Sequence, residues 1–138
     1  LKNQGVCTWS NMPYNVTDCS LLPNANQQSN AGQNKIRGFN KLTVTDFATI
    51  KRNVASDNPV MAVITVYANF FAAAPGYIYN NTSGGYAGMH AVAICGYDDA
   101  RNAFKIENSW GTAWGEGGYS WIDYNFFGQI STEAYVFK

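Results

Sequence analysis

The 138-residue chain is poor in charged residues. They make up 13% of the sequence, and nine basic residues balance nine acidic ones, whereas about 25% of an average soluble domain is charged. Proteins that bind nucleic acids or anionic membrane surfaces do so through clustered positive charge. The scarcity and balance of charge therefore argue against both kinds of partner.

Long apolar segments are also absent. No run approaches the ~20 apolar residues that a membrane-spanning helix needs, so we expect no membrane span. The first residues, LKNQGVCTWS, lack the charged start, apolar centre and cleavage site of a targeting peptide. Since the chain begins with Leu1 and not with methionine, we expect it to be processed or cut from a longer protein. Sequons at Asn15, Asn80 and Asn81 are compatible with secretion.

Histidine and cysteine are scarce. The chain has one histidine, His90, and three cysteines. A metal site requires several ligands at characteristic spacings, and these residues do not provide them, so we expect neither a metal nor another cofactor. Cys7 and Cys19 lie in a polar, turn-rich segment and are expected to form a disulfide, with Cys95 free in an apolar run. Alternatively, one of the first two pairs with a cysteine outside this chain.

Aromatic residues, by contrast, are frequent and make up 15% of the sequence. They predict a rigid core or cleft lined with rings. The length is that of one domain, which we expect to span residues 1–138. Residues 1–40 are rich in Asn, Gln, Ser and Gly and have few apolar positions, so we expect an irregular lead-in that is held by cross-links.

The remaining sequence alternates between helix and strand patterns. Apolar positions at helical spacing follow a cap at Thr45, and they predict a helix of about 11 residues that ends before Pro59. Residues 60–67 are β-branched and apolar on both faces, as in a buried strand. Further strands are expected at residues 90–97, 103–108, 119–124 and 133–137. The fold class is therefore α+β, with one short helix before an antiparallel sheet of about five strands that is curled into a barrel.

The pair of His90 and Asn108 carries the strongest chemical signal. His90 begins an apolar strand directly after the glycine-rich segment GGYAGM, and Asn108 ends the strand that is expected to pair with it. An amide that binds one ring nitrogen orients the ring and leaves the other nitrogen to accept a proton from a nucleophile. A neutral orienting group is sufficient when the nucleophile is a thiol, because a thiolate forms readily beside an imidazolium. The pair thus favours a Cys–His–Asn arrangement, although a lone histidine at the start of an apolar strand is more often a hydrogen-bonded core residue.

The segments GMHAVAICGYDD and IENSWGTAWGEGGY resemble the histidine and asparagine motifs of the papain-like cysteine peptidases. The resemblance implies that His90 is the catalytic base and acid and that Asn108 orients it. It makes Trp110 an aromatic shield over this pair. It makes Trp114 a second tryptophan on the side of the cleft that binds residues after the scissile bond. It further implies a secreted or a lysosomal/vacuolar location.

The resemblance extends toward the start of the chain. GVCTWSNMPYN and DNPVMAVITV are similar to two further segments of the same family, so the resemblance covers essentially all of the chain but only the second half of the fold. It implies the right-hand, β-barrel domain, with the helical left-hand half absent from this chain. Val63, Ala91 and Met89 fall where the family binds the second residue before the scissile bond (P2). We therefore expect a polypeptide substrate with a bulky apolar residue at P2.

The family's nucleophile is missing from its usual place. Cys7 could be taken for the nucleophile, with Gln4 before it as the donor to the oxyanion. However, Cys7 and His90 are only 83 residues apart, whereas the cysteine and histidine of the family are separated by roughly 130–150 residues. Pro13 also interrupts any helix that starts at Cys7. We therefore expect a partner, an N-terminal half that carries the cysteine and comes from the same precursor or a separate chain. The alternative is a non-catalytic binding or inhibitory module that keeps the fold without the reaction.

Overall fold

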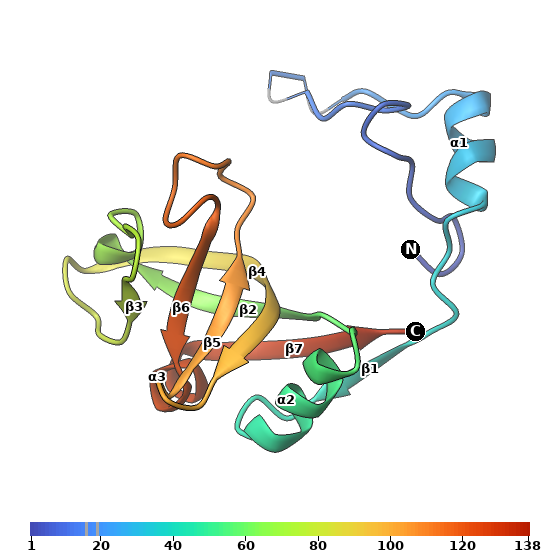
Figure 1. Ribbon diagram of the computed structural model, residues 1–138. Helices are drawn as coiled ribbons and strands as arrows, with labels where there is room; N and C mark the ends of the chain where they lie inside the picture. Colours follow the sequence, from blue (N-terminus) through green and yellow to red (C-terminus); the bar gives the residue numbers. More distant parts are fainter. Residues whose placement is uncertain (16, 19) are drawn as a thin grey trace. The chain divides into compact units, whose positions relative to one another are not determined.

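The computed structural model describes residues 1–138 with the exception of residues 16 and 19. Its contacts divide the chain into two units, residues 1–39 with residue 138 and residues 40–137. Figure 1 shows the elements of both units, coloured along the sequence. His90 and Asn108 both belong to the second unit.

The first unit contains the helix α1 (Ala25–Gly32). Asn24 and Gln27 form a capping box, in which each side chain accepts a hydrogen bond from the backbone of the other, at 3.0 and 2.8 Å. None of the helix residues is buried. The expectation of an irregular lead-in over residues 1–40 is therefore wrong for α1, because this helix is started by its cap and has no apolar stripe that a sequence pattern could reveal.

Cys7 also belongs to the first unit. Among the described residues it has no disulfide partner, and its Sγ donates a hydrogen bond to the carbonyl oxygen of Gln27 at 2.8 Å. The predicted partner, Cys19, lies outside the described residues. The Cys7–Cys19 disulfide therefore stays a prediction.

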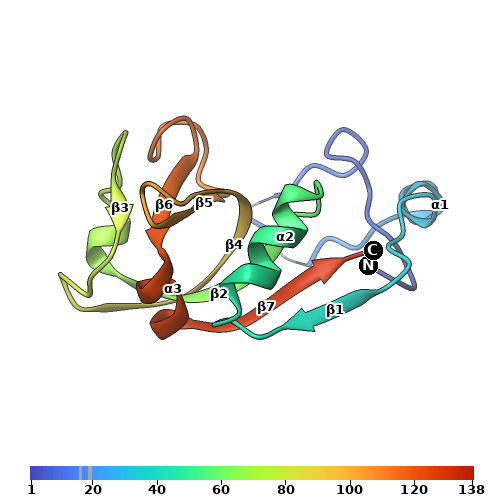
Figure 2. The ribbon, with the colours of Figure 1, turned by 60° about the horizontal axis from the view of Figure 1, so that its bottom comes forward.

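The second unit is built on a sheet with the strand order β1-β7-β2-β4-β5-β6-β3. The strands are β1 (Phe39–Leu42), β2 (Val60–Tyr67), β3 (Ile78–Tyr79), β4 (Tyr86–Asp98), β5 (Ala103–Glu107), β6 (Tyr119–Asp123) and β7 (Ser131–Phe137). The pairs within β7-β2-β4-β5-β6 are antiparallel, and β3 pairs with β6 in parallel. The predicted α+β fold and mostly antiparallel sheet are confirmed. The sheet is curled but not closed, because β1 and β3 are its two edges (Figure 2).

β2 lies between β7 and β4 and positions the site. Its even-numbered residues are buried and its odd-numbered residues are half-buried, as the alternation of side chains in a strand requires. Ile64 is the partner of His90 across the β2–β4 pair, and Val63 is the partner of Ala91. The predicted bounds of this strand are confirmed. Its pairing with β4 sets the position of His90 along the sheet.

The predicted helix of the second unit is α2 (Phe47–Ala55). Its cap is Asp46, whose carboxylate accepts a hydrogen bond from Thr49 N at 3.0 Å, and not the preceding Thr45. The carboxylate of Asp46 takes the capping role because a cap must reach the third residue of the helix.

A further helix, α3 (Tyr124–Ile130), separates β6 from β7. With α1 and α2 it makes three α-helices in the described part of the chain, so the expectation of a single short helix is wrong. Asp123 caps α3, and the aromatic side chains of this helix are buried. About two turns are too few for a helical period to stand out, and Tyr and Phe also favour strands.

The core lies between the sheet and the helices α2 and α3, which contact β2, β4 and β6. Phe104 on β5 is fully buried at its centre. Its ring meets those of Phe47, Tyr124 and Phe127 at centroid distances of 6.0, 4.5 and 5.2 Å. The helices of the described residues include none with both the length and the apolar character to cross a membrane.

Truncation of Phe104 is expected to destabilise the fold. Phe104→Ala removes a buried ring and leaves a cavity, which should cost about 3–5 kcal/mol in the free energy of unfolding. Urea unfolding followed by far-ultraviolet circular dichroism measures this loss. Phe71→Ala is the matched control, because Phe71 is 55% exposed and loses only a ring contact worth about 1 kcal/mol. Equal losses in both variants would contradict the position of the core.

Candidate active site

The imidazole of His90 and the side-chain amide of Asn108 meet where β4 and β5 lie side by side. Asn108 is the first residue after β5, and its backbone N–H donates to the carbonyl of Gly118 at 3.0 Å. His90 Nε2 lies 2.8 Å from Asn108 Oδ1. The predicted contact between the two motifs is therefore present in the structure.

A second hydrogen bond defines the direction of the first. The backbone N–H of Ser109 donates to the same Asn108 Oδ1 at 2.8 Å, so this atom is the amide oxygen and accepts. His90 must then donate through Nε2–H, which leaves a lone pair on Nδ1. Asn108 is 8% exposed, and its Nδ2 is buried without a partner among the described residues.

Aromatic rings surround this hydrogen bond. The Trp110 ring lies 4.8 Å from the imidazole between centroids, with 31° between the planes. Trp114 is buried, and its indole N–H donates to the carbonyl of Phe70 at 3.1 Å. The centroid of the Phe70 ring in turn lies 6.2 Å from that of His90 and 5.6 Å from that of Trp110. Phe70 comes from the 3-10 turn η1 (Ala68–Phe70), and no sequence motif had indicated it.

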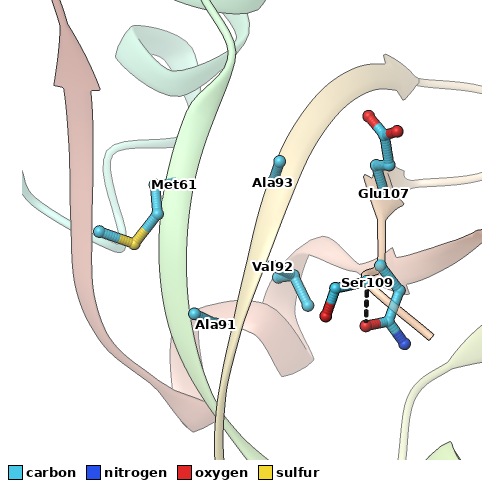
Figure 3. A pocket seen from close by; sticks show the side chains of 7 residues that line it. Met61, Ala91, Val92, Ala93, Glu107 and Ser109 are labelled. Carbon is cyan, nitrogen blue, oxygen red and sulfur yellow. Dashed lines mark hydrogen bonds between the residues drawn. The ribbon is translucent and has the colours of Figure 1, made fainter. Parts of the chain in front are cut away.

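A pocket of about 330 Å³ lies beside the pair. Its lining residues are Met61, Ala91, Val92, Ala93, Glu107, Asn108 and Ser109. Figure 3 shows Met61 on β2, with Ala91, Val92 and Ala93 on the neighbouring strand β4. The wall is thus mostly apolar, with the carboxylate of Glu107 at one end.

Of the three residues predicted for the P2 pocket, only Ala91 lines this cavity. Val63 is half-buried opposite Ala91 on the same face of the sheet. Met89 is 50% exposed, and its Sδ accepts a hydrogen bond from Thr65 at 3.5 Å. Met61 and Ala93, which the sequence had not singled out, take their place in the lining. The alternation of β4 could have revealed Ala93, since it lies two residues beyond Ala91.

The sequence matches the model of the papain family cysteine proteases over residues 1–137. The chain belongs to the papain family of cysteine proteases. The resemblance seen in its histidine and asparagine motifs is thereby confirmed.

Three similar proteins show which part of a papain-family protein this chain represents. A gut-specific cysteine proteinase from Caenorhabditis elegans is 31% identical over 117 residues, which cover 82% of this chain and 35% of that protein. Macrodontain-1 from Ananas macrodontes is 30% identical over 127 residues, or 86% of this chain and 53% of that protein. The crystal structure of xylellain, a cysteine protease from Xylella fastidiosa, matches with a TM-score of 0.84 and 26% identity over 99% of this chain and 57% of xylellain.

The chain thus spans about a third and about a half of these two curated relatives. It corresponds to the C-terminal half of a papain-like peptidase. This is the half in which the structure places His90 and Asn108.

Neither of the two described cysteines, Cys7 and Cys95, is hydrogen-bonded to His90. Cys95 on β4 is half-buried, and burial raises the pKa of its thiol above the ordinary value. Its Sγ lies 3.7 Å from the carbonyl oxygen of Lys105, whereas the Sγ of Cys7 donates to the carbonyl oxygen of Gln27. Within the described part of the chain, no thiol is hydrogen-bonded to His90, and no group of three or more His, Cys, Asp and Glu residues could hold a metal ion.

A glycine in the papain motif is required by a close approach of the backbone. Gly115 has a φ of +61°, and a Cβ atom there would lie 2.1 Å from the carbonyl oxygen of Tyr119. Only glycine fits such a position. The turn after Trp114 therefore depends on Gly115, and with it the position of the indole that bonds to Phe70.

The single histidine makes the hydrogen-bond direction measurable. Long-range ¹H–¹⁵N NMR of the neutral imidazole is expected to show protonation at Nε2. Asn108→Ala should produce a mixture of tautomers, because the acceptor that selects Nε2–H is gone. Ser109→Ala keeps the backbone N–H and serves as the control with an unchanged tautomer. The assignment is wrong if Asn108→Ala leaves the tautomer ratio as it is in the parent chain.

Proposed function

We propose that this chain supplies the base and its orienting amide to a papain-like cysteine endopeptidase. The observation that carries this proposal is the 2.8 Å hydrogen bond between His90 and Asn108 beneath the Trp110 ring. It is supported by the membership in the papain family. The substrate is a polypeptide, and the nucleophilic cysteine lies on an N-terminal half that comes from the same precursor or a separate chain.

The need for a second half follows from the thiols. Cys95 has a raised pKa and bonds toward Lys105, so it is a poor nucleophile at neutral pH. Cys7 is too close to His90 in the sequence for the spacing that this kind of peptidase uses. The relatives extend well beyond the part that this chain matches, which supports a nucleophile in the remaining part.

The reaction would proceed through an acyl-enzyme. The partner's thiolate attacks the peptide carbonyl carbon, a carbon–sulfur bond forms, and the carbon–nitrogen bond breaks as His90 gives its Nδ1 proton to the leaving amine. A water molecule then attacks the thioester while His90 takes its proton, and the carbon–sulfur bond breaks to release the acid and to regenerate the thiolate beside the protonated imidazole. The oxyanion would be held by the nucleophile's own N–H and a glutamine side chain of the N-terminal half.

The chain's own contribution is to hold the imidazole in one tautomer and one orientation. Asn108 Oδ1 fixes Nε2–H, so Nδ1 faces the reaction. Trp110 covers the hydrogen bond, and a hydrogen bond that is shielded from water is electrostatically stronger. Trp114 holds the Phe70 backbone in place, because its indole N–H donates a hydrogen bond to the carbonyl of Phe70.

We further propose that the face with Val63, Ala91 and Met89 receives the P2 residue. Val63 and Ala91 are partners across β2 and β4, and Ala91 lines the mostly apolar pocket. Glu133 is the partner of Val63 on β7. Its carboxylate pairs with Lys41 Nζ at 3.5 Å, so the charge beside this face is already balanced.

A second candidate function is a non-catalytic binding or inhibitory module. It is favoured by one observation, the lack of a thiol bonded to His90 among the described residues. For either function we propose a secreted or lysosomal/vacuolar-type location. If the source gene encodes no cysteine-bearing half upstream of this segment and none pairs with it, the non-catalytic function is the better one.

Substitutions of the pair separate the two functions. In the complete enzyme, His90→Ala should lower kcat by at least about 10²–10⁴-fold, the usual contribution of a general acid–base. Asn108→Ala should lower it by up to about tenfold, because one hydrogen bond is lost. Rates on a fluorogenic peptide measure both, with Tyr97→Ala, an exposed aromatic at the far end of β4, as control. Retention of most activity in His90→Ala would sink the assignment.

A panel of substrates that differ only at P2 tests the apolar face. We expect Leu, Val or Phe to give higher kcat/KM than Asp or Arg, because burial of an apolar side chain is worth about 1.5–3 kcal/mol. Val63→Asp should reverse the order in favour of a basic residue, while Tyr97→Ala should leave it as it is. Arg as the best P2 residue of the unaltered enzyme would contradict the proposal and assign Glu133 to the pocket.

A further inference from the structure

Met89 is the most accessible methionine of this chain. The chain has three methionines, Met12, Met61 and Met89. Met89 is 50% exposed, whereas the other two are half-buried. Peroxides oxidise the thioether of a methionine to a sulfoxide, which turns a flexible apolar side chain into a polar one. Met89 is therefore the methionine that a peroxide in solution reaches first.

The side chain of Met89 belongs to the face of the sheet that we assign to the P2 residue. Met89 and Ala91 are two residues apart on β4, so their side chains point to the same face. Their partners on β2 are Thr65 and Val63. His90 lies between them in the sequence and points to the opposite face. A change in the polarity of Met89 therefore alters the P2 face and leaves the imidazole on the other side of the strand.

The sulfur of Met89 has a hydrogen-bond donor beside it. The hydroxyl of Thr65 donates to Met89 Sδ, with 3.5 Å between oxygen and sulfur. A thioether sulfur is only a weak acceptor, whereas the oxygen of a sulfoxide is polar. The Thr65 hydroxyl thus lies within reach of the oxygen atom that oxidation adds. The oxidised side chain has a partner at the place where the reduced one already lies.

Met61 is the opposite case on the same face. It is half-buried and lines the pocket together with Ala91, Val92 and Ala93. An oxygen atom added to its sulfur would lie against this mostly apolar wall, and burial of a polar group in apolar surroundings is unfavourable. Oxidation of Met61 would disturb packing, whereas oxidation of Met89 changes a side chain that is half in solvent.

We propose that Met89 is a site of reversible oxidation to methionine sulfoxide and that this oxidation weakens the binding of substrates with an apolar P2 residue. The oxidant is hydrogen peroxide. The sulfur attacks one of its oxygens, a sulfur–oxygen bond forms, the oxygen–oxygen bond breaks, and the proton of the transferred oxygen moves to the other, which leaves as water. The sulfur is oxidised and the peroxide is reduced. A methionine sulfoxide reductase reverses the change with two electrons and two protons from thiols, and the oxygen leaves as water.

The modification itself does not depend on the peptidase function, whereas its effect on substrates rests on the proposed function. The site is tested by treating the complete enzyme with limiting hydrogen peroxide. Mass spectrometry of chymotryptic peptides then follows the gain of one oxygen at Met12, Met61 and Met89. We expect Met89 to be oxidised severalfold faster than either of the others. Equal rates, or faster oxidation of Met12 or Met61, would overturn the site.

The effect on substrates is measured with the nucleophilic cysteine protected as a mixed disulfide during the peroxide treatment and released afterwards with a thiol. The ratio of kcat/KM for Leu over Gly at P2 should fall by about three- to tenfold, because a polar group now faces the apolar side chain. Treatment with methionine sulfoxide reductases should restore the ratio. An unchanged ratio after Met89 has been oxidised would overturn the effect.

Two variants assign the effect to one sulfur, each compared with its own untreated form. Met89→Leu should keep its P2 ratio under peroxide, whereas Met61→Leu, the matched control, should lose it as the parent does. An equal fall in Met89→Leu and in the parent would overturn the role of Met89. An enzyme that cleaves no peptide before oxidation contradicts the proposed function alone, since the oxidation rates still decide on the Met89 site.

Discussion

The hydrogen bond between His90 Nε2 and Asn108 Oδ1 is the interaction on which the site depends. It joins the fifth residue of β4 to the first residue after β5, so the antiparallel pairing of these strands is a precondition for it. The oxygen that accepts it is itself fixed by Ser109 N–H. A single atom thus determines which imidazole nitrogen is protonated and which is available for chemistry. The curled sheet, the buried core beneath it and the turn at Gly115 serve to keep this atom in place.

The strands and the chemical pair could be predicted from the sequence because they leave local signals. β2 shows them as a β-branched run with turn residues before it, and its bounds agree with the structure. His90 and Asn108 were found through motifs in which both side chains and the intervening strands have recognisable spacing. The helix α2 was equally visible through its apolar stripe, and only its cap was displaced by one residue.

Other features could not be predicted, for physical reasons that differ between them. The helix α1 has no buried residue, so its sequence has no apolar stripe from which the helix could be predicted. The helix α3 is short and aromatic, and its side chains are buried by contacts with the preceding strand β6 and with β2, which is distant in sequence. Phe70 and Met61 join the site through tertiary packing alone, since their neighbours in the site are distant in sequence. Cys19 lies outside the described part of the chain, so its disulfide remains a prediction.

The bond from the Trp114 indole to the Phe70 carbonyl has a consequence for how such a site can evolve. It joins the loop after β5 to the turn after β2, and Phe70 packs against both tryptophans with no exposed surface. A substitution at position 70 would disturb the surface against which the imidazole lies. Position 71 is less constrained, because its side chain is 55% exposed and stacks only on the outer ring, Trp110. Neighbouring residues of one turn are therefore under opposite constraints: Phe70 is enclosed by the rings of the site, whereas more than half of the Phe71 surface is exposed.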